Sequence, residues 1–240
     1  PTPAIAFLAA KRGCASAAIT ASHNPYSDNG VKLFANGGVK LSDAQQDAIE
    51  SHMTGSATVP SASATQVDLI GEYASHIVGL FPVLAFANIR VVLDCANGAM
   101  SEVAPEVFAR LGATVIVLND RPNGKNINDS CGATHPEVVS EAVRLHKADL
   151  GLAFDGDGDR VIAVDHIGDV VDGDHLIALA AVDLHKRGKL KSNSVAVTVM
   201  TNAGFHQAME KAGINVITTP VGDRNILVAF DEHGLVLGGE

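Results

Sequence analysis

Residues 150–164 read LGLAFDGDGDRVIAV, which is two apolar runs joined by an acidic loop. The runs, residues 150–154 and 161–164, are typical of buried strands. In a straight strand, residues two apart lie about 6.6 Å from each other, too far for three carboxylates to share one small ion. Two glycines in the loop, Gly156 and Gly158, permit the tight backbone with positive φ that would turn the carboxylates inward.

The three aspartates of that loop carry more negative charge than one neighbouring arginine can neutralise. A divalent cation is therefore the expected partner of Asp155, Asp157 and Asp159. The flanking strands argue against an EF-hand, whose loop needs glycine at position six and glutamate at position twelve; Arg160 and His166 stand there instead. The alternative is a turn rich in Asp and Gly that binds no ion.

One supersecondary unit, strand then helix then strand, recurs along the chain. The unit at residues 91–118 has its helix near residues 102–111, and residues 195–218 repeat the pattern. A shorter copy at residues 2–20 lacks the first strand, so we expect the chain to begin inside a domain. The glycines that end the three helices are Gly13, Gly112 and Gly213. Their spacings of 99 and 101 positions (112 − 13 and 213 − 112) predict tandem α/β domains.

Local signals predict where the helices begin and end. Four side chains are candidate helix caps: Thr2, Ser42, Asp172 and Asn202. Ser42 is followed by Gln45 in the spacing of a capping box, and Pro3 suits a first helical position. Further helices are expected at residues 72–84 and 136–147, and from Asp172 through Lys186.

Two stretches have no periodic pattern. Residues 53–66 are rich in Ser, Thr, Ala and Pro and carry no charge, which predicts a flexible surface loop. Residues 122–134 form a long polar stretch with three asparagines. A connection of that length is either functional or a solvated link stiffened by Asn turns, and the residue types leave both open.

Composition narrows the class of protein. The 240 residues are 47% hydrophobic, which is enough for a sizeable core. The net charge of −10 (17 − 27) does not indicate a nucleic-acid-binding protein. No apolar run approaches 18 residues, so we expect no membrane span. Cys14, Cys95 and Cys131 lack a C-x-x-C spacing, which favours buried, reduced thiols of a cytoplasmic protein over disulfides or a zinc site.

A second polar motif, ITASHNPYSDNGVK at residues 19–32, follows the strand of the first unit. The carboxyl end of a strand is the usual ligand position in an open α/β sheet. Ser22 is a candidate nucleophile, with His23 and Lys32 as candidate proton-transfer groups. Neighbouring strand residues point to opposite faces, so His23 is a poor base for a hydrolase triad with Ser22. The alternative is a serine that only forms a turn.

Together the two motifs resemble those of the α-D-phosphohexomutase superfamily, with TASHNPxxxNGxK at residues 20–32 and DGDGDR at residues 155–160. Within this superfamily, the chain is most similar to the phosphoglucosamine mutases, on the basis of residues 94–99, 122–134 and 221–224. The resemblance implies tandem α/β domains with mixed sheets sandwiched by helices. It places domain 1 at residues 1–73, domain 2 at 74–172 and an incomplete domain 3 at 173–240. Parts at both ends, including a fourth domain, are then expected to be missing.

The resemblance also implies roles for individual residues. Ser22 would be a phosphoserine that shares a Mg²⁺ ion with the three aspartates, and Arg160 would hold its phosphate. Lys32 and His23 would transfer protons. The residues implied in substrate binding are Gly222, Asp223, Arg224 and Glu240. The alternatives are a salt bridge from Arg160 to the aspartates, a solvated Lys32 and a His23 that only orients a turn.

The activity implied by the resemblance is the interconversion of glucosamine 6-phosphate and glucosamine 1-phosphate through a bisphosphate, in the cytoplasm. The partner is then a hexosamine phosphate, and neither nucleic acid nor a membrane is expected; the oligomeric state is left open. Two alternatives remain. One is a phosphoglucomutase or phosphomannomutase with the same site, and the other is a binding module that keeps the fold without turnover.

Overall fold

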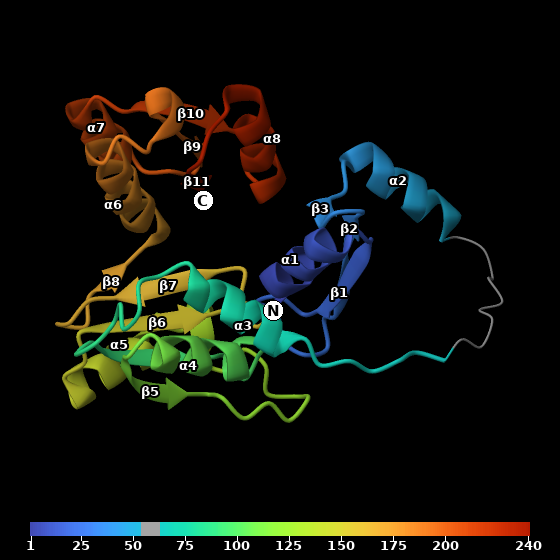
Figure 1. The fold of residues 1–240 in the computed structure, drawn as a ribbon, viewed down its shortest axis with the longest axis horizontal. Helices are drawn as coiled ribbons and strands as arrows, with labels where there is room; N and C mark the ends of the chain where they lie inside the picture. The colour runs from blue at the N-terminus through green and yellow to red at the C-terminus, as the bar shows by residue number, and fades with distance from the viewer. Residues whose placement is uncertain (54–62) are drawn as a thin grey trace. The chain divides into compact units, whose positions relative to one another are not determined.

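The computed structural model describes residues 1–53 and 63–240, which form two compact units, Pro1–Asp169 and Val170–Glu240 (Figure 1). The surface loop expected at residues 53–66 lies mostly outside the described residues. No helix within the described ranges is long and apolar enough to cross a membrane.

The first unit begins with a helix and a small antiparallel sheet. Its elements are α1 (Thr2–Arg12), β1 (Ser16–Thr20), β2 (Gly30–Ala35) and β3 (Val39–Lys40), and the strand order is β1-β2-β3. Helix α1 ends at Gly13, whose φ of 61° is left-handed, as the sequence predicts. The expected cap is wrong: Thr2 lies inside the helix, Pro1 is the N-cap residue, and the Thr2 hydroxyl contacts another loop.

Two helices follow, α2 (Asp43–His52) and α3 (Ile70–Gly79). The capping box at the start of α2 is confirmed, because Ser42 and Gln45 exchange hydrogen bonds between side chain and backbone. Helix α3 ends at Gly79 rather than continuing to residue 84 as expected. Pro82 explains the early end, because a proline disfavours the helical backbone at the residue before it.

A larger mixed sheet carries the second repeat. Its strands in the first unit are β4 (Arg90–Asp94), β5 (Thr114–Leu118), β6 (Leu150–Phe154) and β7 (Val161–Val164), in the order β5-β4-β6-β7. Strand β4 runs parallel to β5 and β6, whereas β6 and β7 are antiparallel. The predicted pair of strands around the acidic loop is therefore confirmed as a hairpin.

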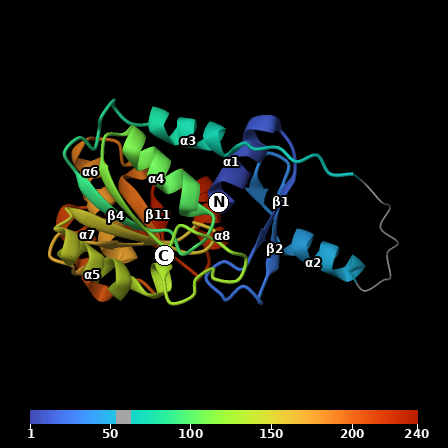
Figure 2. The same cartoon turned by 90° about the horizontal axis from the view of Figure 1, so that it is seen from below.

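Helices cover both faces of this sheet. Val92 packs with residues of α5 (Pro136–His146), whereas its neighbours Val91 and Leu93 pack with Ala104 of α4 (Met100–Arg110). Successive strand residues point to opposite faces, so α4 and α5 lie on opposite sides. Helix α3 lies beside α4 (Figure 2). A short 3₁₀ turn, η1 (Gly132–Thr134), precedes α5. The sheet sandwiched by helices agrees with the predicted fold class.

The second unit contains the third repeat. Its elements, in chain order, are β8 (Val170–Val171), α6 (Gly173–Lys186), η2 (Lys191–Asn193), β9 (Ser194–Thr198), α7 (Ala203–Ala212), β10 (Asn215–Thr219), α8 (Asp223–His233) and β11 (Gly238–Gly239). Strand β9 is buried along its length and parallel to both β10 and β11. Asp172 and Asn202 cap α6 and α7, as predicted. Val195 and Val197 pack against α7, and Ala196 packs against α8.

The three cysteines are free thiols, but one of them corrects the expectation of burial. Cys14 is exposed, because it follows the end of α1 at the surface, whereas Cys95 and Cys131 are buried. Burial, together with the nearby Asp94 carboxylate, raises the pKa of Cys95 to about 12 and that of Cys131 to about 11.

Thiol alkylation should distinguish these environments. Because the thiolate is the reactive form, we expect Cys14 to react at pH 8 at least about a hundredfold faster than Cys95 and Cys131. Peptide mass spectrometry after timed labelling measures the three rates separately, and denaturant should make the rates similar. Equal rates in the folded protein would contradict the burial of Cys95 and Cys131.

Candidate active site

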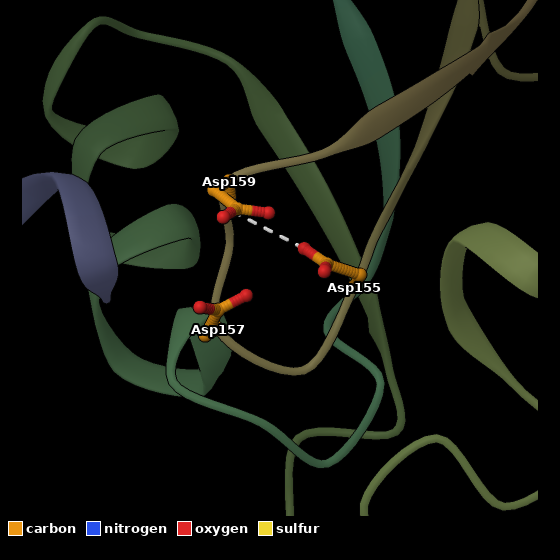
Figure 3. A group of neighbouring side chains, drawn as sticks. All are labelled: Asp155, Asp157 and Asp159. Carbon is orange, nitrogen blue, oxygen red and sulfur yellow. Dashed lines mark hydrogen bonds between the residues drawn. The ribbon is translucent and has the colours of Figure 1, made fainter. Parts of the chain in front are cut away.

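The acidic loop between β6 and β7 is organised by Asp155. One of its carboxylate oxygens, Oδ1, accepts hydrogen bonds from the backbone N–H groups of Asp159 (3.2 Å) and Arg160 (3.0 Å). These bonds curl the loop, and each of the three aspartates offers an oxygen within 4.8 Å of the others (Figure 3). The predicted convergence of the three carboxylates is therefore present. Asp155 and Asp157 are buried, and Asp159 is at the surface.

The two glycines of the loop have different tasks, which corrects the expectation that both take positive φ. Gly158 is left-handed at 69°, whereas Gly156 is not. Gly156 is needed because other loops press against it. An added Cβ there would lie 2.5 Å from the carbonyl oxygen of Ser22 and 2.8 Å from the side-chain nitrogen of Asn128.

Adding a single methyl group at this point should be costly. We expect Gly156→Ala to lower the free energy of unfolding by about 1–3 kcal/mol, because the methyl group has to displace backbone atoms. Gly71→Ala is the matched control: nothing lies within 4 Å of that position, and alanine favours helix α3 by up to about 1 kcal/mol. Chemical denaturation measures both variants, and equal stability would show that the loops can move apart freely.

Asp157 has the polar surroundings of a cation ligand. Its Oδ2 accepts hydrogen bonds from the Thr2 hydroxyl (2.5 Å) and the Lys32 ammonium (2.6 Å). Its other oxygen, Oδ1, is buried, and no donor among residues 1–53 and 63–240 reaches it. A buried carboxylate oxygen without a partner is energetically costly. The residues present therefore fit a small divalent cation, which takes oxygen ligands.

Lys32 comes from β2 and neutralises part of the acidic cluster. Its Nζ lies 2.6 Å from Oδ2 of both Asp157 and Asp159. Burial by itself lowers the pKa of Lys32, but the hydrogen bonds to the two aspartates outweigh burial, and the pKa is raised. Burial also raises the pKa of Asp155, while contacts with Lys32 and Thr2 overcome burial and lower that of Asp157. Lys32 is therefore an ammonium group within the cluster and not a solvated surface lysine.

Ser22 lies just beyond the end of β1 and faces the acidic loop. Its φ of 52° is left-handed, a conformation that costs a non-glycine residue about 1 kcal/mol or more. Its hydroxyl oxygen lies 3.4 Å from Oδ2 of Asp155 and 3.4 Å from Nδ1 of His23. The alternation of strand side chains does not apply here, because Ser22 lies beyond the end of β1, and His23 therefore lies beside the Ser22 hydroxyl. That His23 is a poor base for a hydrolase triad stays a prediction.

Arg160 contributes through its backbone. Besides the N–H donated to Asp155, its carbonyl oxygen accepts the Asp155 N–H (3.3 Å). The alternative of a salt bridge to the neighbouring aspartates is not realised: across the described part of the chain, no carboxylate lies within ion-pair distance of this guanidinium. The side chain is exposed, and its predicted contact with a phosphate stays a prediction.

The predicted substrate-binding residues belong to the second unit. Gly222 is the N-cap residue of α8, and Asp223 and Arg224 form the first turn of that helix. The backbone N–H of Gly222 donates to Oε2 of Glu240 at 3.0 Å, so residues far apart in the sequence meet here. Backbone N–H groups at a helix N-terminus favour anions, and the anion bound here is the Glu240 carboxylate.

Two residues of the site were not predicted. The sequence pattern predicts only a helix cap for Thr2, whereas its hydroxyl and its backbone N–H both bond to Asp157. For Asn128 the sequence indicates only a long polar stretch, whereas its side chain bonds to the backbone of the Ser22 loop. The proline at the start of α1 and the length of the polar stretch were the available signals, and neither identifies a long-range partner.

Models of one protein family match nearly the whole chain. They describe phosphoglucomutase/phosphomannomutase α/β/α domain I at residues 1–59, domain II at residues 71–168 and domain III at residues 172–240. A phosphoglucosamine mutase from Desulforudis audaxviator is 47% identical over all of this chain and 55% of its own length. One from Frankia casuarinae is 48% identical over all of this chain and 54% of its own length.

The fold has close counterparts among solved structures. A phosphoglucomutase/phosphomannomutase family protein from Burkholderia thailandensis matches 94% of this chain and 49% of its own, with a TM-score of 0.79 at 25% identity. This chain therefore spans about half the length of the proteins that it matches.

Ser22 follows a strand of the small antiparallel sheet and faces an acidic loop between two strands of the larger mixed sheet. This arrangement defines the class of the protein as an α/β protein with a polar site at strand ends. The order and extent of the domain matches then fix the family. The chain belongs to the phosphoglucomutase/phosphomannomutase family.

Proposed function

We propose that this chain carries the phosphoserine and metal-binding parts of a phosphoglucosamine mutase, which interconverts glucosamine 6-phosphate and glucosamine 1-phosphate. The observation that carries the proposal is the 3.4 Å approach of the Ser22 hydroxyl to Asp155, 133 positions along the chain. Relatives of that name, 47% and 48% identical over the whole chain, support the choice of substrate.

In this mechanism, Ser22 is both donor and acceptor. Phosphorylated Ser22 transfers its phosphoryl group to the free hydroxyl of the sugar phosphate, which gives a bisphosphate. After reorientation, the bisphosphate returns its other phosphate to Ser22. His23 and Lys32 are assigned to proton transfer, supported by the position of His23 beside the hydroxyl and of Lys32 beside the carboxylates. Arg160 is assigned to the phosphate, which a planar guanidinium matches.

Asp155, Asp157 and Asp159 would hold Mg²⁺ together with an oxygen of phosphorylated Ser22. The bound ion supplies positive charge that offsets the negative charge of the phosphoryl group. The unpartnered Asp157 oxygen supports this assignment. A solved fungal N-acetylphosphoglucosamine mutase of similar fold contains magnesium.

The second unit is assigned to the sugar phosphate. The residues proposed to bind it are Gly222, Asp223, Arg224 and Glu240. The hydrogen bond between Gly222 and Glu240 supports this assignment. The family resemblance supports two further proposals. One is that the domains are residues 1–73, 74–172 and 173–240, and the other is that the protein is cytoplasmic.

A coupled assay of the complete gene product tests the proposal. With Mg²⁺ supplied, we expect glucosamine 6-phosphate to be converted at least about tenfold more efficiently than the glucose or mannose phosphates. The second candidate, a phosphoglucomutase or phosphomannomutase, is favoured by the description of the matching family. Equal or better rates with glucose or mannose phosphate would establish it, and no turnover with any sugar would favour a binding module.

A further inference from the structure

Asn128 lies in the loop between β5 and η1, and its side-chain amide reaches the Ser22 loop. The Nδ2 group donates hydrogen bonds to the carbonyl oxygens of Ser22 (2.8 Å) and Asn24 (2.8 Å). Both acceptors are carbonyl groups, so only the NH₂ end of the amide can face them. One side chain thus hydrogen-bonds to two residues of a loop that lies more than a hundred positions earlier in the chain.

These hydrogen bonds act on the residue whose backbone is strained. The carbonyl of Ser22 accepts the Asn128 amide and also the Gly156 N–H (3.1 Å), so both of its lone pairs are used. The Ser22 carbonyl accepts both hydrogen bonds while the φ of Ser22 is left-handed. Asn128 and the acidic loop therefore hold the same carbonyl.

Asn128 is itself anchored to the core of the larger sheet. Its N–H donates to the carbonyl of Ala96 (2.9 Å), and the N–H of Ala96 donates to Oδ1 of Asp94 (3.0 Å). Asp94 is fully buried at the end of β4 and also accepts the N–H of Gly132 (2.9 Å). A series of hydrogen bonds thus connects the buried end of β4 to the backbone of Ser22.

We propose that Asn128 is a positioning residue for Ser22, which it holds in the left-handed conformation that directs the hydroxyl toward Asp155. The inference rests on the proposed function. Asn128 acts through the Ser22 backbone, so its loss should slow phosphoryl transfer while leaving the affinity for the sugar phosphate nearly unchanged. A misplacement of about 1 Å can cost about a hundredfold in rate.

Steady-state kinetics of Asn128→Ala and Asn128→Asp in the complete gene product test the proposal. We expect kcat to fall about 10-fold to 100-fold with KM within about threefold. The aspartate should be the worse of the two, because it places a carboxylate against two carbonyl oxygens. Asn126→Ala is the matched control: it loses two side-chain hydrogen bonds, to Asn123 and Arg121, that stay within its own loop. The kcat of Asn126→Ala should stay within about twofold of that of the unaltered protein.

Hydrogen exchange followed by mass spectrometry gives a second measurement that needs no turnover. Peptides covering residues 20–29 should exchange faster in Asn128→Ala than in Asn126→Ala, while the strands of the larger sheet keep their protection. If Asn128→Ala matches the control in both kcat and exchange, the inference is overturned and the proposed function stands. If the unaltered protein forms no phosphoserine and turns over no sugar phosphate, the proposed function fails, and the positioning role fails with it.

Discussion

Ser22→Ala should abolish turnover of sugar phosphates, with a loss of at least about a thousandfold in kcat. The hydroxyl of Ser22 is the atom that accepts and returns the phosphoryl group, and alanine leaves no acceptor in its place. The substitution removes one oxygen from a half-buried side chain without adding volume, so we expect the fold to be unaffected. A coupled assay with glucosamine 6-phosphate measures the rate, and mass spectrometry of the intact protein measures the loss of phosphorylation.

Ser27→Ala is the matched control for this experiment. Ser27 lies in the same loop, and within residues 1–53 and 63–240 its hydroxyl bonds only to the neighbouring Asp28 (3.1 Å). Its kcat should stay within about twofold of the unaltered protein. If Ser22→Ala were as active as Ser27→Ala, phosphoryl transfer through Ser22 would be excluded.

Asp157→Asn should weaken the binding of Mg²⁺ at least about tenfold and lower kcat about a hundredfold. Asparagine keeps the shape of the side chain and an oxygen that can accept the Thr2 and Lys32 hydrogen bonds, but it removes the negative charge. The effect should therefore be on the ion and the rate rather than on folding. Isothermal titration calorimetry with Mg²⁺ measures the affinity, and the coupled assay measures the rate.

Asp129→Asn makes the same change of charge at an exposed aspartate. Across the described part of the chain, the side chain of Asp129 bonds only to Ser130 (3.4 Å). Its Mg²⁺ affinity should equal that of the unaltered protein. A similar loss of affinity in both variants would mean that overall charge controls binding. Unchanged affinity in Asp157→Asn would remove Asp157 from the metal site.

Local signals account for the parts of the fold that the sequence predicts. The hairpin around the acidic loop follows from two apolar runs, and the caps at Ser42, Asp172 and Asn202 follow from side chains that bond within three residues. The end of α1 is likewise predicted from one residue, Gly13. Each of these features depends on neighbours in the chain, so residue type and spacing are enough to predict it.

Long-range contacts explain what the sequence does not predict. Gly156 is required by the carbonyl of Ser22, and Thr2 turns from its expected cap to Asp157, 155 positions away. Lys32 meets Asp157 across 125 positions. Nothing in the local pattern identifies such partners. The approach of the two motifs was expected only from their resemblance to a family, and the structure supplies the contacts that hold them together.

The central claim is that Ser22 and the acidic loop form one site. The most direct test is to titrate Mg²⁺ by calorimetry into the complete gene product with Ser22 phosphorylated and again after its dephosphorylation. A phosphate adds about 1.5 to 2 negative charges and three acceptor oxygens. If they lie beside Asp155, the phosphorylated form should bind Mg²⁺ at least about tenfold more tightly, whereas equal affinity in the two forms would contradict the claim.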